Sequence, residues 1–203
     1  MQVKEVCLKN KVGIYILFFS LILFCKTINA NGEEESYKLK VIEYLSEINE
    51  FSSSFIQHDG TSYQEGEFFL KRNRFKIHYT FPANIVLVVK ESNAMYFNVD
   101  LSEVQYFNPD DTAAEIFFDF FYNQKFLDKA EFFLENNSFS FAKTMTLNNE
   151  INNVEIFFEE SPIKLRKIEI INTQGKTSFT IINPNYNPDL DDEIFSLANP
   201  LLS

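Results

Sequence analysis

Phenylalanine constrains this chain more than any other residue type. The 203 residues include 24 phenylalanines and no tryptophan, whereas a domain of this size usually fills its core with Leu, Ile, Val and Ala in defined rotamers. Phe68 and Leu70 follow the two-residue period of a strand, and Phe117, Phe120 and Phe121 follow a helical period. So many flat, stiff rings are better suited to lining an apolar space than to closing it by tight packing. The composition therefore predicts an interior that accepts an apolar ligand.

Residues 1–30 have the pattern of a secretory signal peptide. Three lysines form a basic start, residues 12–24 are an uncharged apolar run, and Ala30 is a small residue at the cleavage position. An apolar run of this length is too short to span about 30 Å of hydrocarbon. An uncleaved anchor is one alternative. A lipoprotein signal at Cys25 is another, and the bulky Phe24 before that cysteine disfavours it.

Residues 31–203 are expected to form a single domain without cysteine. Both cysteines, Cys7 and Cys25, lie in the first 30 residues, which excludes disulfides, thiol catalysis and cysteine–zinc sites from the mature chain. Without residues 1–30, which hold four lysines and one glutamate, 14 basic and 28 acidic residues remain. A net charge of −14 disfavours nucleic acids and anionic membrane surfaces as partners. The alternative explanation of this net charge is that it only keeps the protein soluble.

The patterning predicts an α+β architecture built on one antiparallel sheet. A helix is expected to run to about residue 50, followed by about six strands between residues 51 and 107. A helical insertion follows at residues 112–123, with a second amphipathic stretch at 125–135. About four strands then return between residues 138 and 182, before a tail with a helical turn near Ile194. A sheet of about 10–11 strands curls, and all helices are expected to cover its concave face.

The helix expected at residues 112–123 carries more aromatic surface than a covering helix needs. Thr112 and Glu115 form a capping box at its start. Its rings cover well over half of the circumference, whereas an ordinary amphipathic helix has one apolar stripe about 100° wide. One interpretation is a helix packed between the sheet and a neighbouring helix. The other is a plug whose rings fill an apolar hollow and yield to a ligand.

The apolar cavity is expected to be lined from both layers. Strand alternation supplies part of the lining and the helical plug supplies the rest, although a one-residue slip in register would turn every strand residue to the other face. The predicted lining consists of Phe68, Leu70, Phe75, Ile77, Tyr79, Leu87, Ile116, Phe117, Phe120 and Phe121.

No catalytic residue, metal site or cofactor is predicted. His58 and His78 lack the neighbouring residues that define a nucleophile–base pair or a metal pair. The alternating Asn and Asp residues at 183–189 resemble a calcium loop, but Pro188 occupies the position that needs Gly and Ile194 the position that needs Glu. The chain is therefore not expected to be an enzyme.

Several segments resemble the outer-membrane lipoprotein carrier (LolA) family. The similar segments are residues 51–57, residues 66–79, Met95 to Phe97 with Asp100 and Leu101, the turn at Gln174 and Gly175 with Thr177, and Ile194 and Phe195 before Pro200. They follow the family order over nearly all of residues 31–203. The resemblance implies an incomplete β-barrel closed by helices around an apolar cavity.

The resemblance also implies a function. Such proteins are periplasmic chaperones of Gram-negative bacteria that accept acylated lipoproteins from an inner-membrane, ATP-driven release complex and pass them to an outer-membrane receptor. A monomer is expected. The arginine that latches the helical lid in the family matches Arg72, with Arg74 as the fallback because Asn73 replaces the usual proline. The alternative function is a periplasmic lipid-sensing regulator that binds a signalling protein through the same half-barrel.

Overall fold

The computed structural model describes residues 32–109, 113–147 and 149–202. The predicted signal peptide and Thr112 of the predicted capping box lie outside these residues. The chain divides into two compact units, Met1–Val41 and Ile42–Ser203. In the first unit, the described residues form the start of a helix that spans residues 32–46, with the Lys40 ammonium 4.6 Å from the centre of the Tyr37 ring. The second unit contains the sheet.

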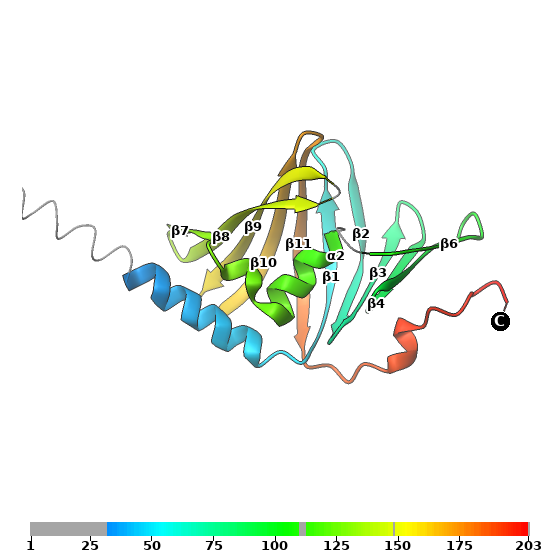
Figure 1. Cartoon of the computed structure of the whole chain (residues 1–203), viewed down its shortest axis with the longest axis horizontal. Helices are drawn as coiled ribbons and strands as arrows, with labels where there is room; N and C mark the ends of the chain where they lie inside the picture. The colour runs from blue at the N-terminus through cyan, green and yellow to red at the C-terminus, as the bar shows by residue number, and fades with distance from the viewer. Residues whose placement is uncertain (1–31, 110–112, 148, 203) are drawn as a thin grey trace, which may run out of the picture. The chain divides into compact units, whose positions relative to one another are not determined.

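The second unit is built on a single antiparallel sheet of 11 strands (Figure 1). The strand order is β6-β5-β4-β3-β2-β1-β11-β10-β9-β8-β7, so β6 and β7 are the two edges and the sheet does not close into a barrel. This confirms the predicted architecture. The strands are β1 (Glu50–His58), β2 (Tyr63–Lys71), β3 (Arg74–Phe81), β4 (Ile85–Lys90), β5 (Asn93–Asn98), β6 (Glu103–Phe107), β7 (Glu131–Glu135), β8 (Ser138–Leu147), β9 (Glu150–Glu160), β10 (Ile163–Asn172) and β11 (Gly175–Tyr186).

Strand register places the apolar rings on one face of the sheet, here called the inner face. Phe68 lies opposite Ile77, and Ile77 lies opposite Leu87 on the next strand. Alternate residues such as Val88 and Met95 point to the other side, here called the outer face. A twisted sheet with two apolar faces must be covered on both, which decides where the remaining segments pack.

A short helical segment packs on the inner face. It consists of α2 (Ala113–Phe118), the π-helical η1 (Asp119–Asn123) and the 3-10 turn η2 (Lys125–Leu127), with Gln124 in the left-handed region at φ 55° between the last two. The prediction of a helical stretch at 125–135 is wrong beyond residue 127, because residues 131–135 form β7. Asn136 and Asn137 both have positive φ and make the tight turn that pairs β7 with β8.

The first helix also ends earlier than predicted, at residue 46 rather than about residue 50. Asn187 replaces the lost helical bonds, since its side-chain oxygen accepts a hydrogen bond from the backbone N–H of Asn49 at 2.7 Å. Glu50 then starts β1. No helix in the part of the chain that the structure describes is long and apolar enough to cross a membrane.

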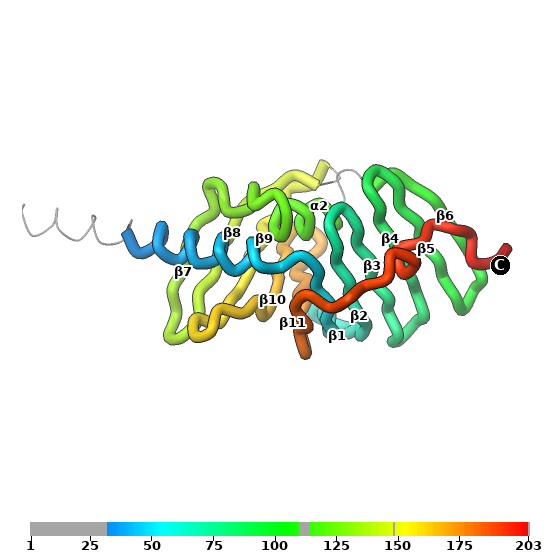
Figure 2. Tube along the Cα trace, turned by 90° about the horizontal axis from the view of Figure 1, so that it is seen from below, coloured from blue at the N-terminus to red at the C-terminus, as the bar shows by residue number. Residues whose placement is uncertain are grey.

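The C-terminal segment crosses the outer face of the sheet (Figure 2). It carries the 3-10 helix η3 (Asp192–Phe195), as predicted near Ile194, and Phe195 is fully buried against Val88 and Met95. The expectation that all helices share one face is therefore wrong for η3. The physical reason is that the apolar outer-face residues of β4 and β5 also need a cover.

Ion pairs attach η3 to the sheet. Asp192 pairs with Lys71 at 2.9 Å and with Arg74 at 2.5 Å, and Lys71 also pairs with Glu50 at 2.9 Å. Arg74 and Lys71 lower the pKa of Asp192 from 3.8 to about 2. A carboxyl group with a depressed pKa in the folded state stabilises the fold above its ordinary pKa, and this stabilisation disappears as the pH falls toward the folded pKa.

We therefore expect Asp192→Asn to lower the melting temperature at neutral pH, and the difference from the wild type to shrink between about pH 4 and pH 2. Thermal unfolding monitored by circular dichroism across this pH range measures the difference. Asp189→Asn is the control, because Asp189 lies on the same segment and forms no ion pair with the described residues. A difference for Asp192→Asn that stays constant down to pH 2 would contradict the ion-pair account.

Candidate functional site: an aromatic interior beneath α2 and η1

The space between the inner face and the helical segment is filled with aromatic rings. The Phe117 ring lies 5.2 Å from the Phe68 ring and 5.0 Å from the Phe75 ring, measured between centroids. The Phe121 ring lies 5.4 Å from the Phe51 ring. Tilted and stacked ring pairs at these distances add a favourable term to simple burial. The helical segment therefore packs its rings against the inner face of the sheet, and its residues 113–123 are called the plug below.

The structure brings the predicted lining residues together. Phe68, Leu70, Phe75 and Ile77 are buried on the inner face, and Ile116, Phe117, Phe120 and Phe121 are buried on the helical segment that faces them. Tyr79 and Leu87 share the same inner face but are only partly buried. The register on which this prediction depends is therefore the observed one, while ligand binding by these residues stays a prediction.

The second half of the sheet adds rings that are not among the predicted lining residues. Phe139 and Phe158 stack with centroids 5.0 Å apart and an interplanar angle of 10°. Phe158 also lies 5.8 Å from Phe120 of the plug, and Phe126 lies 6.1 Å from Phe120. The sequence already shows the strand alternation of Phe139 and Phe141. Only the pairing of β8 with β9 shows that these rings face the plug.

Few polar groups enter the interior. The Tyr79 hydroxyl donates a hydrogen bond to Gln57 Oε1 at 2.9 Å, and burial raises the pKa of Tyr79 to about 12, so the phenol is neutral. A neutral, hydrogen-bonded phenol among rings is compatible with a hydrocarbon ligand, whereas an unpaired charge would not be. None of the described residues that are buried on this face is charged, so the interior is suited to acyl chains.

The two arginines that the resemblance suggests as a latch lie away from the plug. Arg72 is exposed in the β2–β3 turn and takes part in none of the hydrogen bonds or ion pairs seen among the described residues. Arg74 pairs with Asp192 on the outer face instead. The structure thus does not bring either residue to the helical segment in this state, and the latch role of Arg72 stays a prediction.

The histidines and carboxylates form no catalytic or metal arrangement among the described residues. His58 accepts a hydrogen bond from the backbone N–H of Gly60, and His78 bonds to Asn84 at 2.9 Å. Within the described ranges, no group of three or more His, Cys, Asp or Glu residues could hold a metal ion.

The sequence profile of the family described as outer membrane lipoprotein carrier protein LolA matches residues 46–198. The chain belongs to the LolA family. LolA-family proteins are periplasmic proteins that bind lipoproteins, so the family is one of binding proteins and not of enzymes. None of the characterised proteins compared with the chain matches it significantly in sequence.

Solved structures are similar to this LolA-family protein at low sequence identity. A conserved uncharacterised protein of Thermus thermophilus has 7% identity and a TM-score of 0.51, over 79% of this chain and 91% of that one. MucB in complex with periplasmic MucA has 13% identity and a TM-score of 0.47, over 81% of this chain and 60% of that one. The Pseudomonas aeruginosa MucA–MucB complex has 12% identity and a TM-score of 0.45, over 79% and 60%. Only the first of these likenesses supports a shared fold, and it concerns the fold alone.

Proposed function

We propose that this LolA-family protein binds the acyl chains of lipoproteins in its aromatic interior and carries them through the periplasm. In this proposal it receives them from an inner-membrane, ATP-driven release complex and delivers them to an outer-membrane receptor. The observation that carries the proposal is the aromatic plug, which covers an apolar inner face in a chain of the lipoprotein carrier family.

For a carrier, binding energetics favour an interior that is filled by side chains and can open. A permanently empty cavity is less suitable. Each buried methylene contributes roughly 0.8 kcal/mol, so several acyl chains in a preformed dry cavity would bind too tightly to be released. Displacing the Phe117 and Phe121 rings from Phe68 and Phe51 offsets part of this gain. A plug that must move therefore keeps binding reversible, as a carrier requires.

The local structure of the plug is suited to movement. The α-helical part is only six residues long, and it continues as a π-helix, which is uncommon and less favourable than α-helix. A left-handed residue, Gln124, separates the plug from η2. Such a segment depends on tertiary packing for its order, so a ligand that replaces this packing can shift it.

A release assay tests the proposed function. Inner-membrane vesicles that contain the release complex and a labelled lipoprotein are incubated with ATP and the purified protein, and soluble lipoprotein is measured after centrifugation. We expect soluble lipoprotein to appear in proportion to added protein, and none when either ATP or the protein is left out. Binding of acyl chains without any release would instead favour the lipid-sensing regulator.

A further inference from the structure

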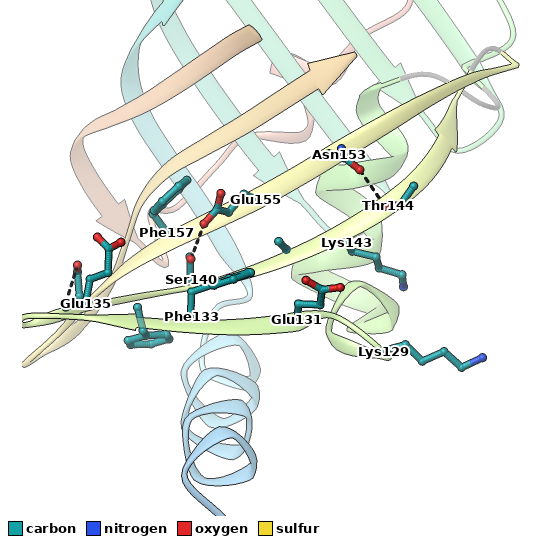
Figure 3. A pocket seen from close by; sticks show the side chains of 13 residues that line it. Lys129, Glu131, Phe133, Glu135, Ser140, Lys143, Thr144, Asn153, Glu155 and Phe157 are labelled. Atoms are coloured by element: carbon teal, nitrogen blue, oxygen red, sulfur yellow. Dashed lines mark hydrogen bonds between the residues drawn. The ribbon is translucent and has the colours of Figure 1, made fainter. Parts of the chain in front are cut away.

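A second hollow lies on the outer face at the β7 edge of the sheet (Figure 3). Its volume is about 760 Å³, and its walls come from β7, β8 and β9. Phe133 of β7 lies opposite Ser140 of β8, which lies opposite Phe157 of β9. Because side chains alternate along a strand, these residues point away from the aromatic interior. The groove therefore opens on the face opposite to the proposed acyl site, and Phe139 is a residue that it shares with the aromatic interior.

The β7 wall of this groove has an acidic–aromatic–acidic row. Glu131, Phe133 and Glu135 are spaced two residues apart and share the outer face, and the Phe133 side chain is 45% exposed. Neither glutamate pairs with a cation among the described residues. Deeper in the groove, Glu155 accepts a hydrogen bond from the Ser140 hydroxyl at 2.6 Å. The carboxylates and the ring of β7 are thus available to a partner.

The neighbouring strand shows how a basic side chain fits this surface. Lys167 of β10 lies over the Phe157 ring, with its ammonium 4.0 Å from the ring centre. A cation over an aromatic face is attracted by the ring quadrupole. Phe133 presents a similar ring without a covering lysine among the described residues, between two carboxylates. Lys129 and Lys143 also line the groove. On β7 itself, however, Phe133 lies between Glu131 and Glu135, so charge complementarity along this row favours a partner with basic side chains on both sides of an apolar one.

We propose that the free edge of β7, the strand that forms the outer wall of this groove, binds an extended peptide segment with basic side chains at positions i and i+4 and an apolar side chain at i+2. In an extended peptide, every second side chain lies on the same face, and the rise per residue equals that of a strand. The peptide side chains at i, i+2 and i+4 therefore meet Glu135, Phe133 and Glu131 in turn. β7 is a terminal strand of the sheet, so no further described strand blocks the approach. Edge strands without lysine or proline are common sites for such segments.

Fluorescence anisotropy with synthetic peptides tests this site. The probe is a labelled peptide with the sequence Thr-Lys-Thr-Phe-Thr-Lys-Thr. One control peptide has Glu in place of both Lys residues, and another has the same composition in the order Thr-Thr-Lys-Lys-Phe-Thr-Thr. The protein variants are Glu131→Lys with Glu135→Lys, and Phe133→Thr. Their matched control is Glu65→Lys with Glu67→Lys, an equal charge change on the outer face of β2, where both side chains are exposed.

We expect the double reversal at β7 to weaken binding of the probe about tenfold, and the β2 control to change it by less than about twofold. Phe133→Thr is expected to weaken binding while it leaves the charge unchanged, which keeps the test valid if the double variant folds poorly. Both control peptides are expected to bind more weakly to the wild type. The proposal is overturned by equal weakening in the two double variants, by equal binding of the rearranged peptide, or by no binding of the probe at millimolar concentration.

Discussion

Phe117→Ala is expected to lower the stability of the protein and, at the same time, to raise its affinity for acyl chains. The Phe117 ring is 5% exposed and contacts the rings of Phe68 and Phe75, so its removal should destabilise the fold by about 3–5 kcal/mol. The same truncation removes a group that an acyl ligand must displace. We expect the dissociation constant for a fluorescent fatty-acid probe to fall about tenfold, equivalent to about 1.4 kcal/mol.

The control for this prediction lies on the other side of the sheet. Phe195 is as deeply buried as Phe117 but packs on Val88 and Met95 of the outer face. Phe195→Ala should therefore destabilise the protein by a similar amount without a change in probe affinity. Urea unfolding and a probe titration measure the two quantities on each variant. Equal effects of both variants on probe affinity would show that Phe117 has no special role as a plug.

Gly66→Ala is expected to be among the most destabilising single substitutions in the sheet. A Cβ atom at Gly66 would overlap the backbone carbonyl oxygen of His78 and would lie 2.9 Å from Phe55 Cζ. Because backbone atoms of β3 cannot move aside cheaply, we expect a loss of about 3 kcal/mol. The register of β2 against β3 also shifts at this point, between Glu65 and Gly66. Denaturant unfolding with linear extrapolation measures the loss.

Gly60→Ala is the comparison for this prediction. Gly60 has φ +95°, but a Cβ atom added there would meet nothing within 4 Å, so only the backbone conformation is strained. The expected loss is about 1 kcal/mol. A Gly66→Ala protein as stable as the wild type would mean that the β2 and β3 backbones do not approach closely at this position.

The strands around the plug follow from local patterns in the sequence. Alternation at Phe68, Leu70, Phe75 and Ile77 predicts both the strands and their shared face, because Arg72 and Asn73 turn the chain between two strands of matching parity. These residues form contacts close in sequence, so a local pattern is sufficient.

Other parts depend on contacts that no local pattern contains. Residues 125–135 have apolar residues that fit a helix or a strand, and pairing of β7 with β8 decides for the strand after residue 127. The position of η3 depends on Asp192, which pairs with Lys71 and Arg74 more than 100 residues earlier. Likewise, Phe139 and Phe158 become part of the interior only once β8 and β9 lie beside the plug.

The central claim is that the plug leaves the inner face when acyl chains enter, and hydrogen–deuterium exchange with a triacylated lipopeptide tests it most directly. Exchange is compared with and without the lipopeptide, and with its non-acylated peptide as control. We expect faster exchange in residues 113–123 and unchanged or slower exchange in β2 and β3, only with the acylated form. Saturating lipopeptide that leaves the exchange of residues 113–123 unaltered would contradict the account.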